Sequence, residues 1–285
     1  MRRIKISATN DNMIMIEITE EILRKLRSVY LEMLIEIDRI CRKNNINYSL
    51  DSGTLIGAVR HGGFIPWDND ADIAMSRAEY EKFFAACKHD LDKEKFFLQD
   101  FRTDKNYRWG FPKIRYNNTV WLMPGQEKTN WHKGIFVDIF VYDGVPDNCI
   151  LKRVHLFICY VIRKGLYSFF GRYNAKNIVI RMWYKLLYLV PRNIWVKAFN
   201  IMVKLSNLSR HKLLRHLTFP YARSKYGMPS ICFQSYIEKD FEGYKFKVYK
   251  EYDLMLRTMY GDYMSLPPKE DRVSFPLAEL KFPNE

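Results

Sequence analysis

The sequence lacks most of the features that mark secreted or membrane-spanning proteins. Its five cysteines are scattered without a CxxC pair, and this odd number indicates neither a zinc site nor a disulfide framework. No apolar run reaches about 18 uninterrupted residues, so no transmembrane helix is predicted. Residues 1–5 are followed by polar residues rather than by the apolar core of a signal peptide. We therefore expect a cytoplasmic protein with reduced thiols, peripheral on the inner face of the cell membrane if it meets lipid.

Acidic residues are missing from one long stretch of the chain. Between Asp147 and Glu238 there is no Asp or Glu, whereas 16 of the 46 Lys and Arg residues lie there. Because the net charge of the whole chain is +14, all of the excess positive charge lies in this segment. Such an asymmetry predicts a polyanionic partner for the segment.

Aromatic and aliphatic residues alternate with these cations, as in residues 180–190. The pattern favours an anionic membrane surface, where apolar side chains enter the acyl boundary and cations meet the headgroups. We expect no nucleic-acid partner, because the chain has no RNP, KH or zinc-finger signature. A solvated helical face, or contacts within the chain or with a substrate, are the other interpretations.

Hydrophobic periodicity predicts the elements of the first half of the chain. Residues 19–44 have the spacing of an amphipathic helix with Thr19 as its N-cap, and Ser76 begins a capping box for a further helix to about residue 87. A short helix is predicted over 54–60. Short strands are predicted over 47–51, 70–75, 96–101, 110–115 and 134–141.

The second half of the chain has a different pattern. From about 150 to 225 it is helical, and Gly171 and Pro191 are expected to divide it into about three helices. A short exposed strand over 244–248 and a helix over 249–260 follow, before an extended tail from Leu266. Gly261 is the expected stop of the last helix.

The stretch from Leu50 to Met75 carries the clearest functional signal. If Asp68, Asp70 and Asp72 lie on an extended segment, their spacing of two places all three carboxylates on one face. Three like charges on one face repel, and Mg²⁺ or Mn²⁺ would remove that repulsion. A solvated loop is the alternative. The turn at Gly53 and Thr54 offers backbone N–H groups to a phosphate.

Asp138 is a further charge within an otherwise apolar strand. Two carboxylates on one strand and a third on its neighbour are the arrangement of a two-metal site, in which the third carboxylate faces the incoming hydroxyl. The alternative for Asp138 is an ion pair in the core with Lys113 or Arg115. These two cations alternate on their strand, so both can face donor phosphates, unless the strand is a solvated edge.

Arg60 and His61 lie at the end of the short helix over 54–60. They could reach the same phosphates, although ordinary surface placement is the alternative. The candidate site therefore consists of three groups of residues. We expect catalytic and metal-binding roles for Asp70, Asp72 and Asp138, an additional metal ligand in Asp68, and donor binding by Gly53, Thr54, Arg60, His61, Lys113 and Arg115.

At these residues the chain resembles the LicD family, the phosphorylcholine transferases of bacterial surface polysaccharides that are related to fukutin-related protein. The resemblance is carried by the block GTLIGAVRHGGFIPWDNDADIAM, by residues 134–140 and by residues 260–268, with further matches over roughly 25–143 and 240–270. It implies that Asp70 and Asp72 are the metal-binding pair and Asp138 the third carboxylate. Asn69 stands where many bacterial members have another Asp.

The resemblance also implies a fold and an activity. The fold is α+β, a nucleotidyltransferase-like small mixed β-sheet flanked by helices, here with a basic helical region added. We expect a core over 1–148, a basic aromatic-rich segment over 149–235 and a C-terminal segment over 236–285 that returns to the core. The segment over 150–235 matches the family poorly.

The implied reaction is divalent-metal-dependent transfer of a phospho-alcohol from a CDP-activated donor, such as CDP-choline, to a sugar hydroxyl. The acceptor would be a cell-surface polysaccharide or a lipid-linked glycan precursor, and CMP would be released. Nucleotidyl transfer from a nucleoside triphosphate and a non-catalytic membrane- or glycan-binding role are the alternatives. Choline, ethanolamine, glycerol, ribitol and phosphonate-type donors all fit the sequence.

Overall fold

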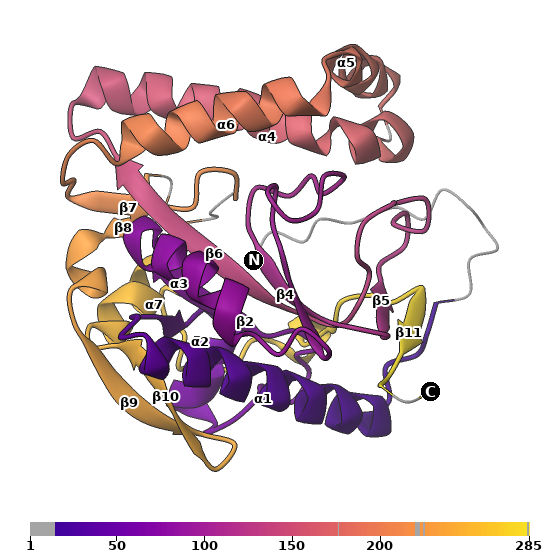
Figure 1. The fold of residues 1–285 in the computed structure, drawn as a ribbon, viewed down its shortest axis with the longest axis vertical. Helices are drawn as coiled ribbons and strands as arrows, with labels where there is room; N and C mark the ends of the chain where they lie inside the picture. Colours follow the sequence, from indigo (N-terminus) through magenta and orange to yellow (C-terminus); the bar gives the residue numbers. More distant parts are fainter. Residues whose placement is uncertain (1–14, 176, 220–222, 225, 284) are drawn as a thin grey trace.

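A mixed β-sheet forms the centre of the molecule (Figure 1). The computed structural model describes residues 15–175, 177–219, 223–224, 226–283 and 285. The strand order is β1-β2-β6-β4-β3; β2 and β6 are parallel, and the other neighbours are antiparallel. The strands of this path are β1 (Ser49–Leu50), β2 (Asp72–Ser76), β3 (Phe96–Gln99), β4 (Lys113–Tyr116) and β6 (Phe136–Val145).

Four helices pack around this sheet at their predicted places. Thr19 accepts a hydrogen bond from the Ile22 backbone N–H (3.3 Å) and caps α1, whose apolar stripe from Leu26 to Ile40 enters the main core. Ser76 likewise caps α3. These helices are α1 (Glu20–Lys43), α2 (Ser52–Arg60), α3 (Arg77–Asp90) and α7 (Tyr252–Tyr260). The prediction of a small mixed sheet flanked by helices is confirmed.

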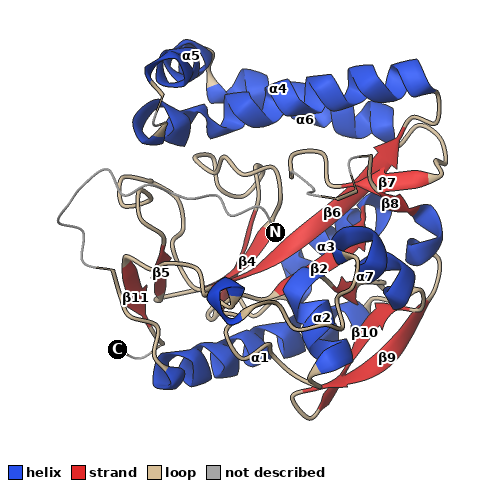
Figure 2. Ribbon diagram, turned by 180° about the vertical axis from the view of Figure 1, so that it is seen from behind, coloured by secondary structure: helices blue, strands red, loops and turns tan. Residues whose placement is uncertain are grey.

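The basic segment forms a separate helical layer over the sheet (Figure 2). Its helices are α4 (Cys149–Asn174), α5 (Ile178–Leu189) and α6 (Arg192–Ser206). Both views show α4 running back from the C-terminal end of β6, so α5 lies at the side of the molecule on which β6 begins. An aromatic cluster of Tyr107, Trp131 and Phe170 joins the layer to the loops beneath it.

Two expectations about this segment were wrong. Gly171 does not end a helix but lies inside α4, where a Cβ would collide with the ring of Tyr184 on α5. The glycine serves close helix packing, which outweighs its low helix propensity. The helical pattern also stops before 225, because β7 (Leu213–Arg215) pairs with the end of β6 and β8 (Met228–Pro229) pairs with β7.

The C-terminal segment returns to the main core. The strand predicted over 244–248 is β10 (Tyr244–Tyr249), which pairs with an unpredicted strand, β9 (Tyr236–Phe241); it is not exposed throughout, because Phe246 and Val248 are fully buried. Helix α7 ends at Gly261, with φ of 78°. The expected extended tail contains a 3₁₀ turn (Lys269–Asp271) and β11 (Glu279–Lys281), which pairs with β5 (Val120–Leu122).

Candidate active site

Two carboxylates meet at the start of the two parallel strands. Asp72 of β2 is the register partner of Asp138 of β6, and Lys113 of β4 is the partner of Asp138 on its other side. Strand pairing therefore fixes the spacing of these three side chains. The side chain of Asp138 is 13% exposed, and Asp72 is buried. The sequence predicted two carboxylates on one strand and a third on its neighbour; β2 begins at Asp72, so Asp72 alone lies on β2, and Asp138 lies on β6.

Asp68 and Asp70 join this pair from the loop before β2. Asp68 lies against the first turn of α2, where its carboxylate occupies the space that a Cβ on Gly53 would fill. Its side chain also shares a hydrogen bond with the Asp70 carboxyl. The Asn69 between them is turned away, and its amide pairs with the backbone of Phe275 (2.8 and 3.0 Å). The loop thus directs Asp68 and Asp70 to the same region as Asp72.

Burial raises the affinity of all four carboxyl groups for protons, and neighbouring carboxylates raise that of Asp70 and Asp72 further. Burial is the largest cause of the raised pKa of Asp70, followed by the charges of Asp68 and Asp72. Burial and the charges of Asp138 and Asp68 likewise raise the pKa of Asp72 well above its ordinary value. A cluster of this kind binds either protons or a cation, because buried carboxylates without counter-charge are costly.

The chemistry of this cluster fits a hard divalent cation. Its donors are carboxylate oxygens, the ligands that Mg²⁺ and Mn²⁺ prefer. The arrangement is not closed, however. Among the described residues, no three Asp, Glu, His or Cys side chains surround a common point in the manner of a finished metal site.

Lys113 provides the nearest positive charge to the cluster. Its ammonium forms an ion pair with Asp138, the pairing considered above as the structural alternative for these residues. The ammonium also lies 3.5 Å from the centre of the Phe136 ring. Burial lowers the pKa of Lys113 to about 8, although the Asp138 charge opposes this shift. β4 lies between β6 and β3, so the idea of a solvated edge strand is wrong.

Arg115 lies on the same face of β4 and is also buried, but its donors are engaged. Its Nε donates to the Gln99 side chain (2.8 Å), and one terminal nitrogen donates to the Gly134 carbonyl (2.7 Å). Burial lowers the pKa of its guanidinium to about 10. Arg115 therefore braces the loop before β6 in this structure, whereas Lys113 reaches the carboxylates.

The predicted turn at Gly53 and Thr54 is the first turn of α2. Its N-terminus lies next to β2, because the Asp51 N–H donates to the Asp72 carbonyl (3.0 Å). The Thr54 hydroxyl is buried and accepts a hydrogen bond from the Asp72 N–H (2.9 Å). Thr54 therefore positions Asp72, while the Ser52 N–H of the first turn meets the Asp51 carboxylate.

Arg60 and His61 lie at the other end of α2. One Arg60 nitrogen donates to the carbonyls of Tyr263 (2.5 Å) and Ser265 (3.3 Å), which belong to the C-terminal tail. The His61 ring meets Trp67 edge to face at 6.4 Å between ring centres. The structure thus brings together Asp68, Asp70, Asp72, Asp138, Lys113, Gly53 and Thr54, and it places Arg60 and His61 apart from them.

Three neighbours of the cluster have no counterpart in the sequence analysis. Asp51 is fully buried, and one of its carboxylate oxygens has no hydrogen-bond partner; burial raises its pKa to about 7. Tyr30 of α1 donates to the Asn69 carbonyl (2.9 Å), and the charges of Asp70 and Asp68 add to burial in raising its pKa. Arg27 holds the loop through the Pro66 carbonyl (2.6 Å). The apolar stripe of α1 concealed Tyr30, and Asp51 stands next to the motif rather than in its alternating pattern.

Comparison with known proteins identifies the family of this chain. A sequence model of the LicD/FKTN/FKRP nucleotidyltransferase domain matches residues 45–152, the part that contains Asp51, Asp72, Lys113 and Asp138. The lipopolysaccharide cholinephosphotransferase LicD of Haemophilus influenzae is 31% identical over 271 residues, 88% of this chain and 94% of that protein. An uncharacterized protein of Rickettsia prowazekii is 46% identical over 52 residues, 18% of this chain and 19% of that protein. The chain therefore belongs to the LicD family, and its sheet is that of a nucleotidyltransferase domain.

Proposed function

We propose that this protein transfers a phospho-alcohol, phosphocholine or a similar group, from a CDP-activated donor to a sugar hydroxyl of a cell-surface polysaccharide or lipid-linked glycan. The observation that carries the proposal is the pairing of Asp72 with Asp138 on adjacent parallel strands, with Asp68, Asp70 and the first turn of α2 beside them. The Haemophilus relative is a cholinephosphotransferase that acts on lipopolysaccharide, which supports the same transferase class for this chain.

In this proposal Asp70, Asp72, Asp138 and Asp68 hold Mg²⁺ or Mn²⁺. The metal would supply Lewis-acid polarisation of the donor phosphates. Thr54 fixes the backbone of Asp72 through its hydroxyl, so the ligand geometry is set before the donor arrives. Lys113 is the cation placed to neutralise donor phosphate charge, since it already faces Asp138.

Asp138 also has the position for handling the acceptor proton. The acceptor oxygen would form a bond to the phosphorus that carries the alcohol, and the bond from that phosphorus to the bridging oxygen of CMP would break. Asp138 would accept or orient the hydroxyl proton once Lys113 turns to the donor. Its raised pKa, caused mainly by burial, favours proton acceptance.

A product assay separates this reaction from its alternatives. We would incubate the protein with Mg²⁺, a glycan acceptor and either CDP-choline or nucleoside triphosphates. CMP release with transfer of the alcohol supports the proposal. Pyrophosphate release from a triphosphate would identify a nucleotidyltransferase, and no product with any donor would favour a non-catalytic glycan- or membrane-binding role. EDTA should abolish turnover; full turnover in EDTA would contradict metal dependence.

The donor's alcohol can be identified by thermal stabilisation. CDP-choline, CDP-ethanolamine, CDP-glycerol and CDP-ribitol would each be added with Mg²⁺, and the cognate donor should raise the melting temperature most. At 100 times its Kd, a ligand adds about 2.7 kcal/mol to the free energy of unfolding. Equal shifts of the melting temperature with CMP alone would show that the site recognises only the nucleotide.

We also place the protein on the inner face of the cell membrane, where a lipid-linked acceptor would lie. Helices long and apolar enough to cross a bilayer are not found in the described part of the chain. Most of its exposed large apolar side chains nevertheless lie on α4, α5 and α6, in the segment that lacks Asp and Glu. Fractionation should find the protein with membranes and release it partly in high salt, since apolar contacts persist when charges are screened. Recovery only in the cytosolic fraction would contradict this placement.

A further inference from the structure

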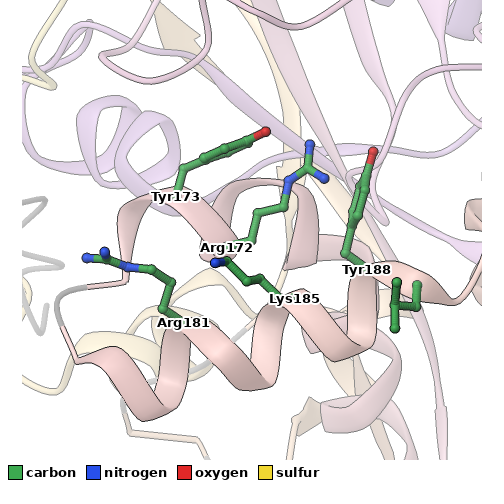
Figure 3. Close-up of a pocket in the computed structure, with 6 residues that line it drawn as sticks. Arg172, Tyr173, Arg181, Lys185 and Tyr188 are labelled. Atoms are coloured by element: carbon green, nitrogen blue, oxygen red, sulfur yellow. The ribbon is translucent and has the colours of Figure 1, made fainter.

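A hollow of about 480 Å³ lies where α5 folds back beside the C-terminal end of α4. Figure 3 shows the cationic side chains of Arg172, Arg181 and Lys185 around it, with Tyr173 and Tyr188 at its sides. Leu189 completes the lining. No acidic side chain contributes to it, so this hollow presents a concentrated positive charge. This site lies outside the carboxylate cluster and plays no part in the chemistry proposed above.

The cations of this hollow are oriented but not neutralised. The Arg172 guanidinium stacks on the ring of Tyr188, 3.4 Å from its centre, and its buried Nε has no hydrogen-bond partner. Within the described part of the chain, neither Arg172 nor Lys185 forms an ion pair. The Arg108 guanidinium also lies near Tyr188, 5.5 Å from the ring centre, and adds further positive charge. An orphaned donor among unpaired cations indicates an oxyanion ligand, because such groups are costly without a partner.

Helix α5 divides into three faces around its axis. Tyr184 and Leu187 are buried against α4. Arg181, Lys185 and Tyr188, spaced at i, i+4 and i+7, form the face toward the hollow. The remaining surface of the helix is apolar and exposed; its residues are Ile178, Val179, Ile180, Met182, Trp183, Leu186 and Leu189. Exposed apolar residues beside a cationic face are the pattern of a helix that lies in a membrane interface.

We propose that this hollow binds the headgroup phosphate of an anionic phospholipid while the apolar face of α5 enters the acyl boundary of the membrane. Arg172 and Lys185 would donate to the phosphate oxygens, as planar and point-charge donors respectively. The charge of the hollow is complementary to an anionic headgroup, and the apolar face of α5 begins at its edge with Leu189, which is 76% exposed. A soluble phosphate would use the cations but not this apolar face, so the lipid is the occupant.

The placement of α5 connects this contact with the carboxylate cluster. Figures 1 and 2 show α5 at the side of the molecule on which β6, with Asp138 near its start, begins. A membrane bound at α5 would therefore present lipid-linked molecules to that side of the molecule. The lipid site itself does not depend on the proposed reaction, and its test below needs no turnover.

The test compares matched single-charge variants of the full-length protein. Lys185→Gln removes an exposed cation of the hollow, and Lys197→Gln removes an exposed cation from α6 of the same layer. Co-sedimentation would use vesicles of phosphatidylcholine alone and of phosphatidylcholine with phosphatidylglycerol. We expect Lys185→Gln to weaken partition onto the anionic vesicles about fivefold, the scale of one cation at an anionic surface, and Lys197→Gln to weaken it less than about twofold. Equal effects of the two substitutions on partition onto the anionic vesicles would overturn the proposed lipid site.

A second variant tests the shape of the site rather than its charge. Arg172→Lys keeps the positive charge but loses the planar guanidinium and its Nε donor. If Arg172 binds the headgroup phosphate, this substitution should weaken partition onto the anionic vesicles several-fold and leave the melting temperature unchanged. Unchanged partition would remove Arg172 from the site, and if the variant does not fold, Lys185→Gln still decides the proposal.

Two further experiments identify the ligand of the hollow. Fluorescence of Trp183, taken as the difference between wild type and Trp183→Phe, should shift to the blue on anionic vesicles, because the indole enters the acyl boundary. Inorganic phosphate at millimolar concentration should not prevent vesicle binding. Calorimetric binding of inorganic phosphate together with negligible binding to both vesicle types would overturn the lipid assignment.

Discussion

A bound cation would stabilise the ionised form of Asp72. This residue is buried, its register partner is another carboxylate, and its backbone N–H and carbonyl are already engaged by Thr54 and Asp51. The backbone of Asp72 therefore cannot move away from its neighbours without breaking these hydrogen bonds. The negative charge of its side chain must be met by a proton, by Lys113 or by a metal ion.

We expect Asp72→Asn to separate catalysis from stability. Turnover should fall by about 100-fold or more, since the variant loses one of the proposed metal ligands and its charge. In EDTA at pH 8 the variant should melt at a higher temperature than the wild type. The raised pKa of Asp72 means that its protonated form favours the folded state, and this stability is lost as the pH rises above the ordinary value of 3.8 through the folded-state pKa.

Thermal melts of Asp72→Asn at pH 5 and pH 8, with and without Mg²⁺, check the sign. The advantage of the variant should shrink at pH 5, where the wild-type carboxyl is more often protonated, and should disappear with Mg²⁺. A variant that melts lower than the wild type in EDTA at pH 8 would show that the Asp72 charge is satisfied by the protein alone.

Asn69 shows why one position of the motif is an amide. Its side chain donates to the Phe275 carbonyl and accepts from the Phe275 N–H, so it holds the C-terminal tail against the loop of the carboxylates. Asn69→Asp would lose the donor and add a charge at a position that is 1% exposed. We expect a loss of about 2–4 kcal/mol in the free energy of unfolding, measured by urea denaturation.

Asn106→Asp is the matched control for that substitution. Asn106 is exposed and also donates to a backbone carbonyl, that of Asn130 (3.0 Å). Its substitution should cost less than about 1 kcal/mol, because water replaces the bond. Equal losses in the two variants would contradict the role of Asn69 as a tail anchor.

At the residue level the sequence was informative where the pattern is local. The alternation of Asp68, Asp70 and Asp72 was visible in the chain, and Asp138 stood out as a charge in an apolar strand. The partners that hold these groups come from distant segments. Tyr30 looked like part of an apolar stripe, and the use of Arg60 by the tail depends on contacts across about 200 residues that no local spacing contains.

Between elements, a buried histidine joins α4 to α6. His155 bonds the Ser206 hydroxyl (2.8 Å) and is 5% exposed. Burial and the nearby positive charges of Arg215 and His211 lower its pKa to about 4, against a weaker opposing effect of Asp143. The neutral imidazole is thus the form that packs between the two helices.

We expect acid to loosen the helical layer through His155. A lowered folded-state pKa means that its contribution is present above about 6.5 and is lost as the pH falls toward 4, by roughly 1–3 kcal/mol in total. His155→Gln keeps a hydrogen-bonding group without this titration, so its free energy of unfolding should depend less on pH over that range. His89→Gln, an exposed change on α3, is the control. Identical pH profiles for wild type and His155→Gln would exclude this histidine as the cause.

Helices and strands were predictable where a single hydrophobic periodicity extends over the whole segment. Helix α1, with Thr19 as its cap, and the strands of the carboxylate motif follow directly from local pattern. Gly171 was misread because its reason is the Tyr184 ring of another helix. Strands β7 and β8 are short, and they and β9 are defined by a partner strand rather than by their own residues.

At the scale of the whole molecule, the two ends of the described chain meet. The Ile16 N–H donates to the Leu277 carbonyl (2.8 Å), and β11 then pairs with β5. Leu277 is fully buried in the main core. The tail therefore closes the core next to the loops around the carboxylates.

Leu277→Ala tests how much this closure stabilises the fold. We expect a loss of about 2–4 kcal/mol in the free energy of unfolding, typical for a buried leucine. Leu266→Ala, at a site that is 53% exposed, should change it by less than about 0.5 kcal/mol. Urea denaturation of both variants checks the difference, and a small loss for Leu277→Ala would mean that the core closes without the tail.

Because β6 pairs with β7, the helical layer is an insertion between two adjacent strands, a cassette that could be replaced as a unit. Val145 and Leu213 are register partners, so the segment 146–212 leaves and re-enters the sheet at one point. A two-residue hairpin turn could join the same strands. The matched nucleotidyltransferase domain ends at residue 152, just inside α4. Exchanging this cassette between relatives would leave Asp72 and Asp138 in register. The binding surface that the helices form can therefore change while the chemistry of the carboxylates stays the same.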